Sequence, residues 1–214
     1  QIRMTATRAG GNKELGEFTA AELEMLAEDE DVEIVPHFAF QEVFFLAGSY
    51  GPFQAKMPTS VPLWLALQLK NRQLCSIRLP QWLDKRELDD LADQEDKTRG
   101  ENLLTIVDFH YQEKAALLFR HSADSFAGQD GNPRVAMKDL EELRESKLHT
   151  SLRTMDSYQS VIELHNISAM EINRLRGFVV GSLEHYSKMS KAEDILKQGE
   201  DASQLDASQV GNSL

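Results

Sequence analysis

Apolar residues near the start of the chain alternate with polar ones, as in strands. In residues 31–38 (DVEIVPHF), Val32 and Ile34 alternate with acids, and residues 42–48 (EVFFLAG) are rich in aromatic and β-branched side chains. Both segments predict strands. The glycine and proline residues of SYGPF and KMPTSVP are typical of turns, and they predict that a small β-containing unit ends near residue 60.

A short helix is predicted before these strands. Thr19 and Glu22 have the spacing of a capping box, and Phe18 and Leu23 occupy the two positions of a hydrophobic staple. We therefore expect a helix that runs to about Glu28.

Helical spacing dominates from residue 61 to about residue 190. The first segment is ambiguous, because four leucines alternate strictly, which is a strand pattern: Leu63, Leu65, Leu67 and Leu69. The length of the segment and the run QLKNRQ favour a helix. On that helix the leucines cover more than one face, so we expect the isolated chain to leave some of them exposed.

Three more helices are predicted in the middle of the chain. Residues 84–87 (DKRE) resemble a capping box that leads into Leu88, a further helix runs from about Leu103 to His121, and Pro133 opens a long one. The long helix carries a stripe at spacings of three and four: Met137, Leu140, Arg144, Leu148, Leu152 and Met155.

The last predicted helix begins with a second capping box, Ser168 to Glu171, flanked by Ile167 and Ile172 as its staple. Its inward stripe consists of Ile172, Val179, Leu183 and Tyr186.

These elements predict a mainly α fold with a small β-rich N-terminal domain. Residues 1–17 show no sustained period and are predicted to be a flexible extension. Residues 18–60 form the β-rich domain and residues 61–190 the helical domain. Residues 191–214 have little apolar content and are predicted to be a disordered tail.

Composition narrows the classes of function. The 214 residues include 35 acidic and 23 basic side chains, a net charge of -12, which repels phosphate backbones. We therefore expect DNA contact to be indirect or weak, although a cationic patch of Lys70, Arg72 and Arg78 could touch DNA locally. No apolar run approaches the roughly 20 residues of a membrane helix. A single cysteine, Cys75, fits a reducing compartment.

The sequence contains no catalytic signature. The six histidines are scattered without an HExxH pair, and residues 47–52 (AGSYGP) lack the endings of phosphate-binding loops. There is no GxSxG elbow. We predict no catalytic, cofactor-binding or metal-binding residue, and hence no enzyme. Cys75 is better explained as a small buried hydrophobe than as a nucleophile.

Several side chains are candidates for a protein interface instead. Tryptophan and arginine are typical interface anchors, although both indoles could also belong to the core. Arg144 could extend from the edge of the core or pair with a carboxylate across an interface. The candidate interface residues are Trp64, Leu65, Arg72, Trp82, Arg144 and Leu148.

Four segments resemble a known family. ELEMLAEDEDVEIVPHF, LAGSYGPF, VPLWLALQLKNRQLCSIRLPQWL and NISAMEIN resemble, in that order, the Psf-two subunits of the eukaryotic GINS complex. The resemblance covers roughly residues 20–189. It implies a GINS-like helical bundle with the β-rich part first, and a non-enzymatic subunit of a heterotetramer with three other GINS subunits.

The resemblance also implies a place for the tetramer. GINS joins the MCM ring and a RecJ-like accessory protein in the nucleus, giving the replicative DNA helicase of initiation and fork progression. The segment from Trp64 to Trp82 would help to build an interface with sister subunits. From the residues of the β-rich domain we add the hypothesis that a second surface, with acids at 28–31 and aromatics (Phe44, Phe45, Tyr50, Phe53), contributes to contact with the wider helicase.

Two alternatives from other classes remain at this point. One is a stand-alone helical adaptor or regulatory protein. The other, weaker, is an enzyme whose dispersed residues converge only in three dimensions.

Overall fold

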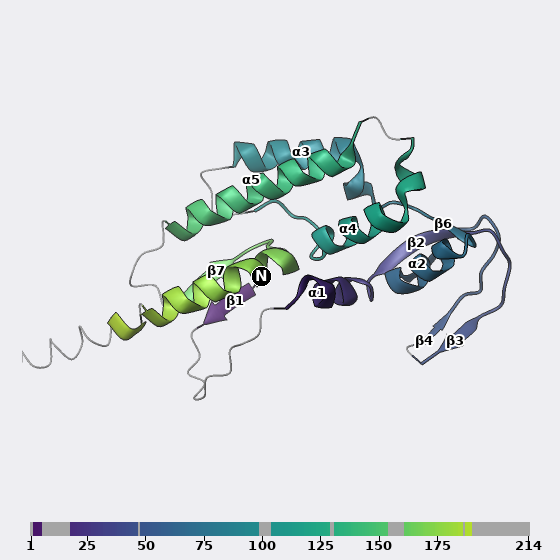
Figure 1. The fold of residues 1–214 in the computed structure, drawn as a ribbon, viewed down its shortest axis with the longest axis horizontal. Coiled ribbons are helices and arrows are strands. Elements are labelled where there is room, and N and C mark those ends of the chain that lie inside the picture. Colours follow the sequence, from purple (N-terminus) through teal and green to yellow (C-terminus); the bar gives the residue numbers. More distant parts are fainter. Residues whose placement is uncertain are drawn as a thin grey trace, which may run out of the picture.

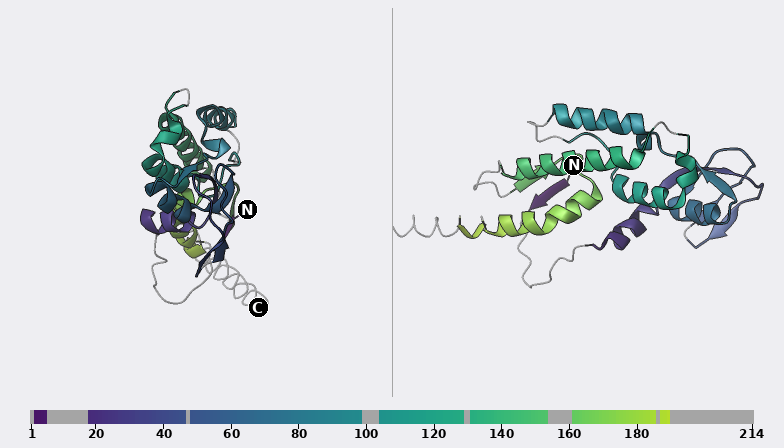
Figure 2. Two further views of the ribbon diagram at one scale, coloured as in Figure 1. Left: turned by 90° about the vertical axis from the view of Figure 1, so that its right-hand side faces the viewer. Right: turned by 45° about the horizontal axis from the view of Figure 1, so that its top comes forward.

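The computed structural model describes residues 2–5, 18–46, 48–98, 104–128, 131–153, 161–185 and 187–189. The molecule is elongated and mainly helical, with strands concentrated toward one end (Figures 1 and 2). This confirms the predicted fold class, a mainly α protein with a small β-rich N-terminal part.

The elements follow in chain order. They are β1 (Ile2–Thr5), α1 (Ala20–Ala27), β2 (Asp31–Pro36), β3 (Val43–Phe45), β4 (Gly48–Tyr50), β5 (Thr59–Pro62), α2 (Leu63–Asn71), β6 (Cys75–Ile77), the 3₁₀ turn η1 (Gln81–Leu83), α3 (Lys85–Lys97), α4 (Tyr111–His121), the 3₁₀ turn η2 (Ala123–Phe126), α5 (Pro133–Arg153) and β7 (Val161–Leu164). A last helix, unlabelled in Figure 1, covers residues 169–185 and 187–189.

The main sheet is antiparallel with β2 in the centre, in the order β5-β2-β6. Ile34 of β2 lies opposite Thr59 on one side and Ile77 on the other. Val32 and Ile34 are buried while Asp31 and Glu33 are exposed, as the alternating pattern predicted. The sheet therefore has strands on both sides of residue 60, and the division of the chain into domains at that residue stays a prediction.

α2 confirms the helical interpretation of the alternating leucines. Leu63, Leu65 and Leu67 are all buried, and α2 packs against the sheet and α4. The expectation that the isolated chain leaves these side chains exposed is wrong, because its own sheet and helix cover them. Beyond α2, Cys75–Ile77 forms a strand in a region predicted to be helical.

One predicted cap and one predicted helix start differ from the structure. Asp84 stands at the N-cap of α3, but its side chain accepts no capping hydrogen bond. The helix predicted from about Leu103 begins only at Tyr111. The reason is tertiary, since the carbonyl groups of Leu104 and Thr105 accept hydrogen bonds from Asn166 and Arg144 instead of from a helical turn.

Both remaining capping boxes are confirmed. At α1, Thr19 Oγ1 accepts from Glu22 N (3.3 Å) while Glu22 Oε2 accepts from Thr19 N (2.7 Å). At the last helix, Ser168 Oγ accepts from Glu171 N (3.3 Å) and Glu171 Oε2 accepts from Ser168 N (2.8 Å).

The core has two parts. The larger extends from β2 and the other strands of the sheet through α2 to α4 and α5, and includes Ile34, Leu63 and Leu118. The smaller lies where α5 meets the last helix and consists of Leu104, Leu148, Ile167, Leu175, Val179 and Leu183.

Two N-terminal segments contact segments that lie late in the sequence. Phe18 N donates to Asn173 Oδ1 (2.9 Å), and Asn173 Nδ2 donates to Phe18 O (2.7 Å). β1 pairs antiparallel with β7. The prediction of a flexible extension over residues 1–17 therefore does not hold for Ile2–Thr5. Residues 6–17 and the predicted tail at 191–214 lie outside the described residues.

Candidate interaction site

The described part of the chain offers little for metal or thiol chemistry. Among its residues, no group of three or more His, Cys, Asp or Glu side chains could hold a metal ion. None of its helices is long and apolar enough to cross a membrane. Burial raises the pKa of the Cys75 thiol to about 11, so the thiolate that a nucleophile needs is not formed at neutral pH.

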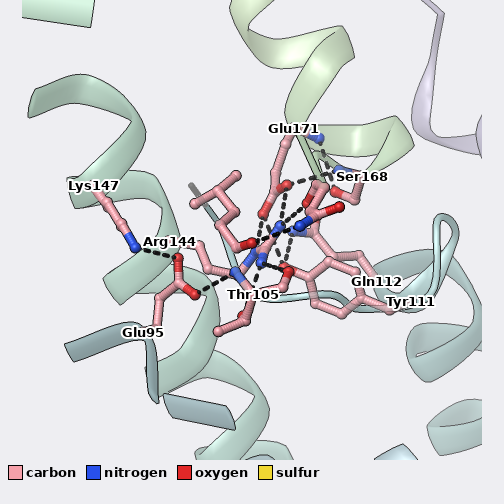
Figure 3. A network of polar contacts seen from close by, with 10 residues as sticks. Glu95, Thr105, Tyr111, Gln112, Arg144, Lys147, Ser168 and Glu171 are labelled. Atoms are coloured by element: carbon pink, nitrogen blue, oxygen red, sulfur yellow. Dashed lines mark hydrogen bonds and ion pairs between the residues drawn. The ribbon is translucent and has the colours of Figure 1, made fainter. Parts of the chain in front are cut away.

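The most strongly connected polar group is Arg144, whose side chain is fully buried. Its Nε donates to Glu171 Oε1 (2.7 Å) and its Nη2 to Glu171 Oε2 (2.9 Å), a bidentate ion pair. Its remaining N–H groups reach the carbonyls of Thr105 (3.1 Å) and Asn166 (2.8 Å). Figure 3 shows these side chains converging from α5, the last helix and the segment before α4.

Neighbouring groups complete this network. Tyr111 donates its hydroxyl to Glu171 Oε1 (3.1 Å) and accepts from Gln112 (2.9 Å). Burial alone would raise the pKa of Glu171, but the hydrogen bonds and charge of Arg144 outweigh it and hold that pKa below its ordinary value. Glu171 is therefore ionised at neutral pH.

A second buried pair lies beside the first. Lys147 of α5 lies 3.5 Å from Glu95 of α3, and it donates to Thr98 (2.8 Å). The other carboxylate oxygen of Glu95 accepts from Thr105 N (2.9 Å). In Figure 3 the two pairs lie next to each other, so together they fix α3, α5 and the last helix.

Three of the candidate interface residues are thus used inside the chain. Arg144 pairs with a carboxylate of its own chain, so it neither extends from the edge of the core nor pairs across an interface. Leu65 and Leu148 are buried in the larger and smaller core clusters, respectively. These three side chains are therefore not available to bind another protein.

Both indoles are partly buried against the larger core cluster. Trp64 meets Phe45 and Tyr50 edge-on, with ring centroids 5.4 Å and 6.1 Å apart. Trp82 meets Tyr111 edge-on at 6.5 Å. Each indole is therefore packed on its own chain with part of its surface exposed, and an interface role for either stays a prediction.

The predicted cationic patch is largely neutralised. Lys70 pairs with Asp124 (2.5 Å) and Arg78 with Glu33 (3.0 Å). Arg72 is exposed at the end of α2, and its interface role stays a prediction.

Exposed apolar side chains gather on the β3–β4 hairpin. Phe44 is 79% exposed and Leu46 at the turn is fully exposed, while Phe45 is 42% exposed. Phe40, just before the hairpin, is also exposed. Phe53, which sequence analysis placed on this surface, is buried instead. The hairpin lies at the end of the molecule opposite the C-terminal end of the last helix (Figures 1 and 2).

Helices also carry exposed apolar side chains, among them Phe18, Met25 and Leu26 at α1, and Phe178 and Met189 of the last helix. Others, such as Met57, Ile106 and Phe109, lie in loops. Where such side chains form a large contiguous patch, the patch is typical of a protein interaction surface.

Sequence analysis missed the residues that make the network and the hairpin distinctive. Glu171 appeared there only as a helix cap, and Glu95, Lys147 and Leu46 were not singled out. The pairing of Glu171 could have been predicted from its position beside the apolar stripe of its helix, because a buried acid at such a position needs a cation.

Comparisons with known proteins agree with the family resemblance of the sequence. Residues 19–78 match the family model of the PSF2 N-terminal domain. The chain is 37% identical over 171 residues to the DNA replication complex GINS protein PSF2 of Xenopus laevis, covering 79% of this chain and 91% of the relative. The human protein of the same name is 36% identical with the same coverage. The probable DNA replication complex GINS protein PSF2 of Drosophila melanogaster is 29% identical, covering 89% and 92%.

Proposed function

This chain belongs to the PSF2 family of the DNA replication complex GINS, and we propose that it is a non-catalytic structural subunit of a GINS heterotetramer. In this role it binds three different sister subunits. The tetramer in turn braces the MCM ring and its RecJ-like accessory protein in the nucleus, during replication initiation and fork progression.

One observation of the structure carries the proposal. The buried polar groups around Arg144 are bonded to one another, whereas large apolar side chains on α1, the last helix and the β3–β4 hairpin remain in water. A reaction site would reverse this arrangement, with reactive polar groups accessible from a cleft. A rigid interior with apolar outer surfaces suits a subunit that binds other proteins.

The electrostatic balance supports an indirect relation to DNA. The chain has a net charge of -12, and two of the three cations in its basic patch are paired with acids. A surface of this sign does not attract phosphate backbones. In our proposal the chain acts on DNA only through the helicase that it helps to hold together, by binding the active arrangement better than the inactive one.

Co-production with the three other GINS subunits tests the proposal. We expect one particle with one copy of each subunit, by size-exclusion chromatography with light scattering. The purified particle should hydrolyse no ATP, and it should bind the MCM ring together with the accessory protein.

Two results would contradict this expectation. A stable monomer that ignores the sister subunits favours the stand-alone adaptor. An enzymatic turnover that persists through purification and disappears with a substitution in this chain would show that the protein is catalytic.

A further inference from the structure

We propose that Glu113 of α4 is a pH-sensitive switch on the attachment of the last helix, which is held when the Glu113 side chain carries a proton and loosens when that side chain is ionised. The inference goes beyond the proposed function and does not depend on it, because it concerns a movement within this chain.

The start of the last helix is attached to α4 and to the segment before α4. Ala169 N donates to Phe109 O (2.9 Å), and the hydroxyl of Tyr111 donates to Glu171 Oε1 (3.1 Å). Single hydrogen bonds of this kind add modestly to stability. A buried charge beside them is therefore large enough to change how often the attachment opens.

Glu113 lies in the first turn of α4, two residues after Tyr111. It is 1% exposed, and within the described part of the chain neither of its carboxylate oxygens has a hydrogen-bond partner. An ionised carboxylate at such a position lacks both water and hydrogen-bond donors, whereas a protonated carboxyl group carries no charge that needs them. Opening of the attachment lets water reach the carboxylate, so ionisation favours the open arrangement.

The charged groups that face Glu113 come from two other parts of the chain. The last helix contributes Glu171 and Arg174, and the turn between α1 and β2 contributes Glu30. Burial, reinforced by the two acids, raises the pKa of Glu113, and Arg174 opposes this rise without cancelling it.

The two neighbouring acids already have cations. Glu171 forms an ion pair with Arg144 of α5, and Glu30 forms one with Lys114 of α4. Glu113 is the member of this group of three acids that is not hydrogen-bonded to any cation among the described residues.

Glu113 and Glu171 respond to pH in opposite directions. Despite burial, the hydrogen bonds and charge of Arg144 hold the pKa of Glu171 low, so its contribution is lost only as pH falls through that lowered value. The contribution of Glu113 is complete below the ordinary glutamate pKa of about 4.3 and is lost as pH rises through its raised value. The attachment is therefore tightest where Glu171 is ionised and Glu113 is still protonated.

Hydrogen exchange of the full chain, followed by NMR, tests the switch at the amide of Ala169. The exchange rate divided by the intrinsic rate at the same pH gives the equilibrium constant for opening. We expect this constant to rise above about pH 4.3, by up to about tenfold per pH unit, and to level off once Glu113 is ionised. A constant that does not rise between about pH 4.3 and about pH 7 would overturn the inference.

Substitutions identify the group that titrates. Glu113→Gln and the apolar Glu113→Leu should each remove the rise, because neither side chain can ionise. Glu142→Gln, on the exposed side of α5, is the matched control and should retain it. A rise that persists in both Glu113 variants would contradict the proposal.

Glu141 of α5 is the competing titratable group. Burial raises its pKa as well, and it interacts with the same Arg174 and Glu171. We expect Glu141→Gln to retain the rise. If this variant removes the rise while Glu113→Gln retains it, the switch belongs to Glu141 and the inference fails. Because exchange is measured in this chain alone, its failure leaves the proposed assembly with sister subunits untouched.

Discussion

Glu113 and Glu171 are both buried glutamates, yet of the two only Glu171 is hydrogen-bonded to a cation among the described residues. Glu171 receives two hydrogen bonds from Arg144. Within the described part of the chain, neither carboxylate oxygen of Glu113 has a hydrogen-bond partner, and burial, reinforced by the charges of Glu171 and Glu30, raises the pKa of Glu113. At the scale of single residues, the same side chain therefore stabilises the fold at one position and weakens it at the other.

Glu113→Gln should increase the stability of the chain at neutral pH. A group whose pKa is higher in the folded than in the unfolded state stabilises fully below the unfolded pKa, and that contribution is lost as pH rises through the folded value. Removing the charge should thus increase the free energy of unfolding at pH 7 by on the order of 1 kcal/mol. The gain should shrink toward the ordinary glutamate pKa of about 4.3.

Urea unfolding followed by circular dichroism at several pH values measures this gain. Glu142→Gln on the exposed side of α5 is the matched control and should change stability by less than about 0.5 kcal/mol. A loss of stability at pH 7 in the Glu113 variant would show that its carboxylate is compensated.

The bounds of the helices and strands depend on local contacts and on contacts between residues distant in sequence. Only the local contacts can be predicted from the sequence. The capping boxes at Thr19 and Ser168 depend on residues three positions apart, so both were predictable. The late start of α4 was not, since it depends on Arg144 and Asn166, distant in sequence, bonding the carbonyls before the helix. Likewise β6 is a strand because it pairs with β2.

At the candidate site, too, the local features were predictable and the long-range contacts were not. The sequence predicted that the aromatic residues near β3 and β4 belong to a strand and contribute to an interaction surface. Which of them faces water depends on docking, because Trp64 holds Phe45 and Tyr50 while Phe44 alternates away. Phe53 was misplaced for this reason, as its burial comes from packing against the core.

Glu171→Gln should loosen the last helix from α5. Breaking one side of a buried ion pair leaves Arg144 uncompensated and typically costs about 3–5 kcal/mol. Because the pKa of Glu171 is lowered by folding, its contribution is present at neutral pH and is lost as pH falls through that lowered value. The deficit of the variant should therefore be largest near pH 7 and smaller in acid.

Hydrogen exchange of residues 169–185 and chemical denaturation measure this effect together. The apolar pair Arg144→Met/Glu171→Leu should be more stable than Glu171→Gln alone, because it leaves no buried charge without its partner at these two positions. Equal exchange in the wild-type and Glu171→Gln chains would show that the ion pair does not hold the helix.

At the scale of the whole molecule, the sheet and the helices share one core. β2 is the central strand, and its Ile34 belongs to the same buried cluster as Leu118 of α4 and Leu140 of α5. The β-containing part is thus integrated with the helical part through packing on both sides of residue 60.

Deletion of residues 1–58 should prevent folding of the remainder. It removes β2, which leaves β5 and β6 without a common neighbour and exposes Val61 and Ile77. We expect the truncated chain to be insoluble or to lack cooperative unfolding by circular dichroism, and to form no tetramer. Cooperative unfolding of this fragment would show that the helical part folds independently.

The contact between Phe18 and Asn173 joins positions 155 residues apart. During synthesis on a ribosome, α1 leaves the exit tunnel long before its partner exists. At about 5–20 residues per second, roughly 8 to 30 s pass between the two. Throughout that interval the backbone of Phe18 lacks the side chain of Asn173 that holds it in the finished fold, so the start of α1 stays unfastened until the last helix has been made.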